Sequence, residues 1–396
     1  MLPMTFLALD EKTECIGIYS NGTLNFSQDR DQNYDKTWKY SKICNKDTLY
    51  ANIYAGGKDF NEVCPEELKE EWDRLNNQAK AYIRSFIESK VSLKENCFYD
   101  LVPEKFLINY CDIKCRIIDY VFENYPKPID YDFKSQLEIL LSNIRIQKLS
   151  FDEDWIKNNL HEPKVKEFSQ SFLSKENYIN YNQFHSKTGR LTTGENSFPI
   201  LNISKNLRGL IKPDNDFFVD IDYNAAEVRV FLALSGFKQP INDIHEWNRG
   251  KFGYADRNTA KNEFISWLYG KKNIRERDFK EYYNTDMIKK KYWDGSKVKN
   301  YYGREIESDE FHSVNYIVQS STADMALRQV LKVNEILKNT KSKIKMIIHD
   351  NIVIDMNKDD KHLVKQIVDT YNSTDFGKFK SSVKIGKSLN DMRKII

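Results

Sequence analysis

The sequence has no cysteine after Cys115, and all six of its cysteines fall within the first 115 residues. An even number of cysteines would permit disulfides. However, the opening residues MLPMTFLALDEK form only a short apolar patch with no basic stretch before it. Such a patch is too short to span a membrane and is more typical of a buried strand than of a signal peptide. We therefore expect reduced, packed cysteines, a cytoplasmic protein and no membrane partner.

The chain is also poor in residues that form flexible linkers. It has 15 glycines and 9 prolines among 396 residues, and it contains no repeat or low-complexity tract. Its net charge of +3, its 40% hydrophobic content and its 30% charged content are ordinary for a globular protein. This length allows two or three domains. One basic run, from Lys271 to Arg304, fits a solvated surface and a phosphate-binding surface equally well.

Changes in the spacing of apolar residues divide the chain. The first 60 residues alternate and predict strands, whereas residues 64–125 have helical spacing. Later, FFVDIDY (217–223) predicts a buried strand, and AAEVRVFLALSG (225–236) predicts a helix that ends at a glycine. The segment IKMIIHDNIVIDM (344–356) predicts a hairpin. The sequence therefore predicts a mixed C-terminal part that contains both strands and helices.

Two aspartates stand at places where a buried carboxylate needs a partner or a metal. Asp222 ends the strand at 217–223, and Asp350 lies at the tip of the hairpin. Hard divalent cations prefer carboxylate oxygens on rigid backbone. Read locally, however, Asp222 is a normal helix cap and Asp350 a normal turn residue, and the local pattern alone favours those readings.

The order of six segments changes this interpretation. They are HSKTGRLTT (185–193), VDIDYNAAEVRVFLALSG (219–236), DIH (243–245), RNTAKNEFISWLYG (257–270), NYIVQSSTADMALR (315–328) and IIHDNIVID (347–355). In sequence and in order they resemble the polymerase segments of bacterial DNA polymerase I and its phage relatives, which form DNA polymerase family A. The resemblance covers about 180 residues, and six ordered matches are unlikely to arise by chance.

The resemblance implies an α+β right-hand polymerase, preceded by a small α/β domain like RNase H. The palm would hold an antiparallel sheet, the fingers would be helical and the thumb much reduced. The implied domains are residues 1–125, 126–180 and 181–396, with fingers at about 237–309. The implied activity is template-directed DNA synthesis, which adds deoxynucleoside triphosphates (dNTPs) to a primer 3′-hydroxyl with two Mg²⁺ ions, for which Mn²⁺ can substitute. Primer–template DNA, dNTPs and a processivity or replisome protein are the implied partners. The implied compartment is the cytoplasm of a bacterium or of a virus-infected host.

Carried over position by position, the resemblance also implies roles for single residues. Asp222 and Asp350 would bind the metals and be catalytic. The dNTP would meet Glu227, His245, Arg257, Lys261, Ile265 and Tyr269, and the DNA would meet Arg190, Gln319 and His349. Glu227 would disfavour a 2′-hydroxyl on the incoming sugar. Arg257, Lys261, Ile265 and Tyr269 recur every four residues, so on a helix they share one stripe.

Three positions depart from the family pattern. Asn351 stands where the family usually has glutamate, so one acidic group near the metals is lost. Ile265 stands where phenylalanine or tyrosine is usual, and Ala225 replaces a polar residue. These changes bear on nucleotide selectivity and rate more than on the type of reaction.

The first 120 residues weakly resemble the 3′–5′ exonuclease domain of the family. At three expected carboxylate positions the chain has Lys12, Ala55 and Lys114. Such a site would not hold two Mg²⁺ ions, which predicts an enzyme without proofreading. An unrelated α/β module is the alternative for this region. The interval from Asp152 to Thr188 is short for a thumb, which predicts a weak grip on duplex DNA.

Two other functions remain open. A single-subunit RNA polymerase shares the same chemistry, but typically carries a small residue where this chain has Glu227. A non-catalytic DNA-binding relative would not need both aspartates together with Arg257 and Lys261, although Asn351 leaves room for it.

Overall fold

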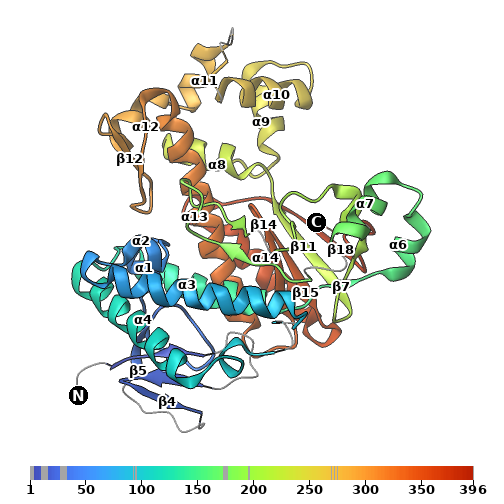
Figure 1. Cartoon of the computed structure of the whole chain (residues 1–396). Helices are drawn as coiled ribbons and strands as arrows, with labels where there is room; N and C mark the ends of the chain where they lie inside the picture. Colours follow the sequence, from blue (N-terminus) through green and yellow to red (C-terminus); the bar gives the residue numbers. More distant parts are fainter. Residues whose placement is uncertain are drawn as a thin grey trace. The chain divides into compact units, whose positions relative to one another are not determined.

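A computed structural model describes residues 4–9, 17–26, 34–91, 93, 96–172, 177–194, 197–268, 270–271, 273 and 275–395. The chain divides into two compact units, Met1–Ser142 and Asn143–Ile396 (Figure 1). Within the described residues, no helix is long and apolar enough to cross a membrane. The predicted domain boundaries near residues 125 and 180 remain predictions.

The first unit contains short strands in two patterns. The strands are β1 (Met4–Thr5), β2 (Leu7–Ala8), β3 (Ile18–Ser20), β4 (Thr23–Asn25), β5 (Tyr34–Thr37) and β6 (Leu49–Tyr50). Strands β2, β3 and β4 pair antiparallel, and β3 is joined to β4 by a turn in which Asn21 and Gly22 have positive φ. Strands β1, β5 and β6 pair parallel. The β-rich start that the sequence predicts is therefore present, as short segments.

Helices supply most of the core of the first unit. They are α1 (Ala51–Tyr54), α2 (Phe60–Val63), α3 (Glu66–Glu88), α4 (Glu104–Asn124) and α5 (Tyr131–Arg145). Helix α4 buries a nearly continuous apolar face that includes Phe106, Tyr110 and Ile117. It packs along α3 (Figure 1). The ring of Trp72 on α3 stacks on Tyr110, with centroids 6.1 Å apart. Cys111 and Cys115 are buried, unbonded thiols in this core, as expected.

An antiparallel sheet of five strands organises the second unit. Its order is β14 (Lys343–Ile348), β15 (Asn351–Met356), β11 (Phe217–Tyr223), β18 (Ser381–Gly386) and β19 (Arg393–Lys394). Strand β11 is central, and its Phe218, Val219 and Ile221 are fully buried. Strands β14 and β15 form the predicted hairpin, with the turn at residues 349–350. The strand predicted at 217–223 coincides with β11.

Three helices pack with this sheet, namely α8 (Ala226–Leu234), α13 (Glu310–Leu337) and α14 (Val364–Asn372). Helix α13 has 28 residues and is therefore about 42 Å long. Asp309 begins it by accepting a hydrogen bond from the backbone N–H of His312 at 2.8 Å. Ser313 to Ala326 contribute mostly buried side chains, so the middle of α13 lies in the core.

A helical insertion separates α8 from α13. It contains α9 (Ile244–Phe252), α10 (Arg257–Leu268), α11 (Glu276–Tyr282), α12 (Thr285–Tyr292) and a hairpin of β12 (Lys297–Lys299) with β13 (Glu305–Glu307). These helices cluster around one end of α13 (Figure 1). Their shared core is aromatic, with Phe264, Phe279 and Tyr283 fully buried. Asp256 caps α10, because its carboxylate accepts the backbone N–H groups of Asn258 and Thr259 at 2.9 Å.

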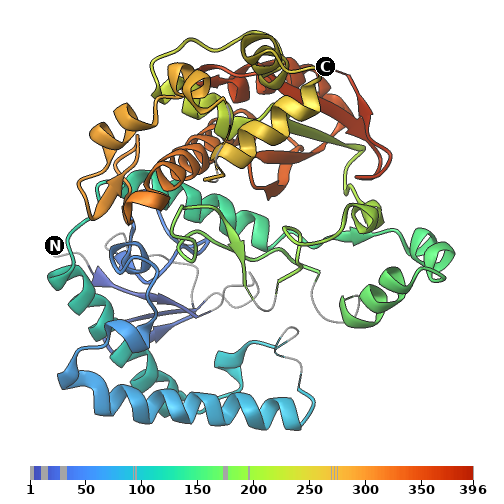
Figure 2. The ribbon, with the colours of Figure 1, turned by 90° about the horizontal axis from the view of Figure 1, so that it is seen from above.

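Residues 143–216 form only small elements before β11. The helices are α6 (Glu153–Asn159) and α7 (Pro163–Phe172), and the strand pairs are β7 (Ser150–Phe151) with β10 (Ile211–Lys212) and β8 (Tyr181–Asn182) with β9 (Thr192–Thr193). Helices α6 and α7 lie to one side of the sheet in both views (Figures 1 and 2). The described part of the interval from Asp152 to Thr188 therefore contains two short α-helices.

Candidate active site

A cavity of about 450 Å³ opens in the second unit where β11 ends. The β14–β15 turn, the first turn of α8, one side of α10 and the middle of α13 form its walls. The structure brings nine of the predicted site residues to this cavity: Arg190, Asp222, Glu227, His245, Arg257, Lys261, Ile265, His349 and Asp350. These residues are separated by up to 160 positions in the sequence, and the fold collects them in one place.

Pairing between strands places the two aspartates. Asp222 lies directly opposite Asn351 in the β11–β15 ladder, and Asp350 immediately precedes Asn351 in the turn. Because adjacent strands are about 4.8 Å apart, the two aspartates lie close together, Asp222 near the end of β11 and Asp350 just before the start of β15. His349 has φ +59, a left-handed conformation that lets the chain reverse tightly at this point. The two carboxylates are thus presented by sheet backbone rather than by a long loop.

Two stacked tyrosines connect the backbone segments that carry the two aspartates. The Tyr371 hydroxyl donates to the backbone carbonyl of Asp350 at 2.9 Å. Tyr223, which follows Asp222, stacks on Tyr371 with ring centroids 4.3 Å apart, and its hydroxyl donates to the Tyr371 carbonyl. Both rings are buried, so this contact ties the end of β11 to the hairpin turn.

The surroundings of the Asp350 carboxyl favour the binding of a cation. Burial raises the pKa of the Asp350 carboxyl above its usual value, although nearby His349 and Arg190 oppose this shift. A buried carboxylate in this situation is stabilised when a positive charge binds beside it. The amide of Asn351 adds a second sign, because its Oδ1 is buried and has no hydrogen-bond partner within the described part of the chain. Two carboxylates and an unused amide oxygen are ligands that Mg²⁺ accepts.

The described residues contain no cluster of three or more histidine, cysteine, aspartate or glutamate side chains that could enclose a metal. Mg²⁺ is commonly bound by one or two carboxylates, with waters and substrate phosphates as its other ligands. The donor set around Asp222 and Asp350 therefore fits Mg²⁺ that arrives with a phosphate substrate. It does not fit a metal held by protein side chains alone.

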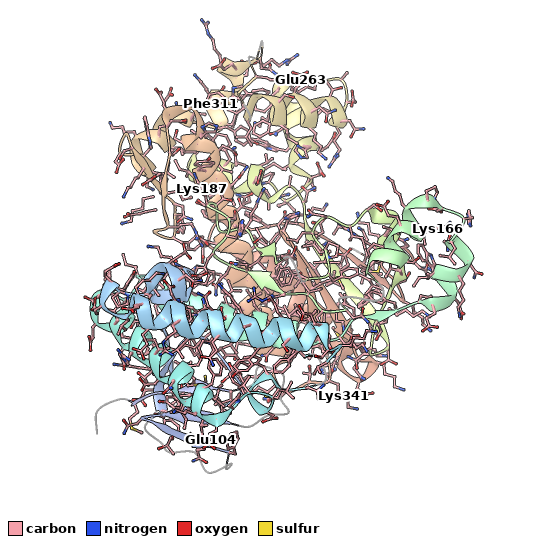
Figure 3. The ribbon with its side chains drawn as sticks, viewed as in Figure 1. Glu104, Lys166, Lys187, Glu263, Phe311 and Lys341 are labelled. Atoms are coloured by element: carbon pink, nitrogen blue, oxygen red, sulfur yellow. The ribbon has the colours of Figure 1, made fainter. Side chains whose placement is uncertain are left out.

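Basic side chains face the aspartates from α10. Arg257, Lys261 and Ile265 all line the cavity, so the three described members of the predicted stripe face one space. Phe264 is fully buried in the aromatic core, which follows from the 100° rotation between neighbouring helical residues. Glu263 is exposed at the outer surface of the insertion (Figure 3). Helix α10 therefore directs its positive charge inward, towards Asp222 and Asp350.

Asp243 holds Arg257 in place. The Arg257 Nε and Nη2 atoms donate to the two carboxylate oxygens of Asp243 at 3.0 and 2.7 Å. Asp243 also caps α9 and accepts the side-chain amide of Asn224 at 2.6 Å. Burial alone would raise the pKa of Asp243, but these hydrogen bonds, led by Arg257, lower it well below its usual range. Asp243 thus connects the starts of α8, α9 and α10.

His245 is buried against the cavity. Burial, followed by the positive charge of Arg257, lowers its pKa to about 4. Its Nδ1 is buried and has no hydrogen-bond partner in the described residues. His245 is therefore neutral near pH 7 and offers a hydrogen bond rather than a positive charge.

Arg190 and Glu227 form an ion pair across the cavity. Glu227 lies in the first turn of α8, and Arg190 lies in the loop between β8 and β9, which Lys187 marks in Figure 3. The side chains keep 40% and 22% of their exposure, so both remain reachable from the cavity.

Sequence reasoning missed an arginine that shapes the cavity wall. Arg229 on α8 is fully buried and donates to the backbone carbonyls of Asn224, Pro240 and Asn242 at 2.8–3.0 Å. It also donates to the Asn224 side chain at 3.1 Å. Burial lowers its pKa to about 10. The signal was present in the sequence, because Arg229 is the single basic residue in the apolar run AEVRVFLAL.

A second missed contact fixes the loop that carries Arg190. Arg304 donates to the two carboxylate oxygens of Asp324 at 3.1 and 2.6 Å, and Asn300 donates to the same carboxylate at 2.8 Å. The Arg304 guanidinium packs on Gly189, where an added Cβ would lie 2.6 Å from it. Gly189 also has φ +76. Glycine is required there for both reasons, and its neighbour Arg190 is positioned as a result.

The other predicted residues have different outcomes. Gln319 is half-buried on α13 and is not part of the cavity wall. Tyr269 and Lys12 lie outside the described residues. In the first unit Ala55 is buried at the end of α1, and the Lys114 ammonium lies over the rings of Tyr110 and Phe60 at 4.2 and 5.3 Å.

Known proteins resemble the chain in both sequence and fold. The family model of DNA polymerase family A matches residues 266–390. DNA polymerase I of Aquifex aeolicus (strain VF5) is 24% identical over 253 residues, which cover 52% of this chain and 44% of that protein. The chain therefore spans less than half the length of this curated relative.

The fold comparison agrees with the sequence comparisons. The POL domain of Pol1 from M. smegmatis, solved in complex with DNA primer–template and dNTP, superimposes with a TM-score of 0.56 at 11% identity. The match covers 72% of this chain and 76% of that one, and at this identity it supports the fold alone. The sequence matches confirm the predicted resemblance, since residues 266–390 match the model of DNA polymerase family A and the curated relative is a DNA polymerase I.

Proposed function

We propose that the protein is a template-directed DNA polymerase that adds dNTPs to a primer 3′-hydroxyl. The observation that carries this proposal is the cavity, in which Asp222 and Asp350 on adjacent strands face Arg257 and Lys261 on one helix. Phosphoryl transfer requires little covalent chemistry from protein. It requires carboxylates for metal ions and cations for the phosphates, in one rigid place.

In this proposal the five-stranded sheet is the palm, the insertion α9–α12 forms the fingers, and α6 with α7 is the reduced thumb. Asp222 and Asp350 would hold two Mg²⁺ ions, or Mn²⁺ in their place, which supply charge neutralisation at the triphosphate and activation of the primer hydroxyl when bound. A helical unit as small as α6 and α7 would hold duplex weakly, which is why a processivity or replisome protein is part of the proposal.

The incoming nucleotide would lie along α10. Arg257 and Lys261 would bind its triphosphate, and neutral His245 would donate or accept one hydrogen bond there. Glu227 and Ile265 would border the sugar, with Tyr269 near the templating pair. To reach the primer–template, Arg190 and Glu227 must exchange their ion pair for contacts with substrate. Arg190, Gln319 and His349 would contact the primer–template itself.

We further propose that the first unit has no exonuclease activity. The Lys114 ammonium packs on aromatic rings at one predicted carboxylate position, and buried Ala55 stands at another. Neither side chain can bind Mg²⁺.

A primer-extension assay tests the function and separates it from the two alternatives. Labelled primer–template is incubated with Mg²⁺ and either dNTPs or ribonucleoside triphosphates. We expect extension with dNTPs. Extension with ribonucleotides alone would identify an RNA polymerase, for which Glu227 is an unfavourable neighbour. DNA binding without any extension would identify a non-catalytic relative.

A further inference from the structure

Asn351 is the least expected residue at the proposed catalytic centre, because the family resemblance predicts a glutamate there. In the structure its side-chain amide is not free to turn. The Asn351 Nδ2 atom donates to Asp220 Oδ1, and Asp220 lies two residues before Asp222 on β11. Alternate residues of a strand face the same side of a sheet, so Asp220 and Asp222 share a face. Asn351 lies opposite Asp222 in the next strand and joins them on that face.

A lysine on the strand at the other side of β11 pairs with the Asp220 carboxylate. Lys384 lies opposite Asp220 in the β11–β18 ladder, with 3.7 Å between its Nζ and Asp220 Oδ2. The two oxygens of Asp220 thus have different neighbours, Lys384 for Oδ2 and the Asn351 amide for Oδ1. The Asp220 side chain keeps 14% of its exposure and is largely removed from solvent, whereas Lys384 keeps 39%.

The orientation of Asn351 follows from this contact. An ionised carboxylate accepts hydrogen bonds and cannot donate one, so only the NH₂ group of the amide can face Asp220. The amide oxygen must then point to the other side. Asn351 Oδ1 is buried and has no hydrogen-bond partner among the residues that the structure describes. A buried acceptor without a partner is costly unless a ligand or water satisfies it.

We propose that Asp220 is a positioning residue, which fixes Asn351 so that Oδ1 becomes a neutral oxygen ligand for a divalent cation at the Asp222–Asp350 pair, or for a water bound to that cation. This proposal rests on the proposed polymerase function. A glutamate at position 351 would place two carboxylates side by side, with Lys384 on the other side of β11 as the neighbouring positive charge. With Asn351, the chain has a neutral oxygen at this place and its negative charge on the adjacent Asp220.

A double-mutant cycle measured by Mn²⁺ binding tests the proposal. The full-length protein is titrated with Mn²⁺, and the free ion is followed by electron paramagnetic resonance. The variants are Asp220→Ala, Asn351→Leu and both together. Residues that orient metal ligands change metal affinity by about 10- to 100-fold, so we expect each single change to weaken binding about tenfold. If Asp220 acts through Asn351, the double variant binds no more weakly than Asn351→Leu does.

If the losses of Mn²⁺ affinity in the two single variants multiply in the double variant, to about a hundredfold, Asp220 acts by its charge alone. That result would overturn the proposal. Unchanged affinity in Asp220→Ala would overturn it too. A matched exchange provides the rescue. Asp220→Asn with Asn351→Glu reverses donor and acceptor and keeps the hydrogen bond, so Mn²⁺ affinity should return to the wild-type value or exceed it. Affinity as weak as that of Asp220→Ala would contradict the assigned orientation.

The same titration separates this inference from the proposed function. Asp350→Ala should lose Mn²⁺ binding whether or not Asp220 positions Asn351. Wild-type binding that does not depend on Asp350 would refute the two-metal site itself. Binding that depends on Asp350, together with a multiplicative cycle, would refute only the role of Asp220.

Discussion

At the scale of single residues, we expect Glu227, which pairs with Arg190, to border the sugar of the incoming nucleotide. Replacing Glu227 by alanine opens space beside the sugar and removes a charge. We expect ribonucleotide incorporation to rise at least about tenfold relative to deoxyribonucleotide incorporation, because selectivity is a difference in transition-state binding. Single-nucleotide insertion kinetics measure the ratio. Arg190→Gln is the matched control, since it breaks the same ion pair and leaves the carboxylate in place. An equal rise in both variants would assign the effect to the ion pair.

Ile265 is the other residue expected at the sugar. It lines the cavity one helical turn after Lys261, where the family usually has an aromatic ring. Ile265→Tyr should change the incorporation of 2′,3′-dideoxynucleotides relative to dNTPs, because the new ring would lie beside the sugar. Phe264→Tyr is the neighbouring control and should act through stability, since Phe264 is fully buried in the aromatic core. An unaltered dideoxynucleotide ratio in Ile265→Tyr would refute the placement of the sugar at Ile265.

At the scale of secondary-structure elements, the Arg304–Asp324 pair joins the β12–β13 hairpin to α13. The side chains keep 16% and 4% of their exposure, and breaking such a pair leaves a buried charge without its partner. We expect Asp324→Asn to lower the free energy of unfolding by about 3 kcal/mol, as measured by urea denaturation. Lys299→Gln is the control in the same hairpin. Its ion pair with Glu305 is exposed and should contribute less than about 1 kcal/mol.

A second cluster of ion pairs lies at the sheet, and it predicts that the stability of the fold depends on pH. Asp214 binds Lys345, whose side chain is fully buried, at 2.7 Å and Lys343 at 3.1 Å. Burial alone would raise the pKa of Asp214, but the hydrogen bond from Lys345 leads the contacts that lower it to about 2. A depressed folded-state pKa stabilises the fold above the unfolded value near 3.9, and this stabilisation is lost as the pH falls towards 2.

We therefore expect Asp214→Asn to be less stable than wild type at pH 6, and the difference to shrink by about 2 kcal/mol between pH 4 and pH 2. Chemical denaturation at each pH measures the difference. Burial raises the pKa of neighbouring Asp355, so protonation of Asp355 cannot imitate this loss. A difference that stays constant down to pH 2 would contradict the assignment to Asp214.

At the scale of the whole molecule, sequence reasoning located the elements better than the contacts between them. The strand at 217–223, the hairpin around Asp350 and the stripe on α10 are local patterns. The strand, the hairpin and the three described members of the stripe are present. The Arg304–Asp324–Gly189 contact and the Asp220–Asn351 pair were missed, because no local period links residues so far apart in the chain. The neutral state of His245 depends on burial and on Arg257, which a sequence does not display.

The first unit provides a prediction about the molecule's range of activities. With Ala55 and Lys114 at expected carboxylate positions, we predict no shortening of a 3′-mismatched primer when metal is present and nucleotides are omitted. The Asp222→Ala/Asp350→Ala double variant is the control, since it removes the proposed polymerase centre. Shortening that persists in this variant would reveal an independent nuclease site and would refute the alignment of the first 120 residues.

The central claim is that Asp222 and Asp350 form the catalytic pair of a DNA polymerase. Its most direct measurement is extension of a labelled primer–template with Mg²⁺ and dNTPs by wild type, Asp222→Ala and Asp350→Ala, with DNA affinity measured in parallel. The account predicts that wild type extends the primer, and that each variant loses extension while binding DNA with nearly unchanged affinity, because basic residues supply the phosphate contacts. Extension by either variant at close to the wild-type rate would contradict it.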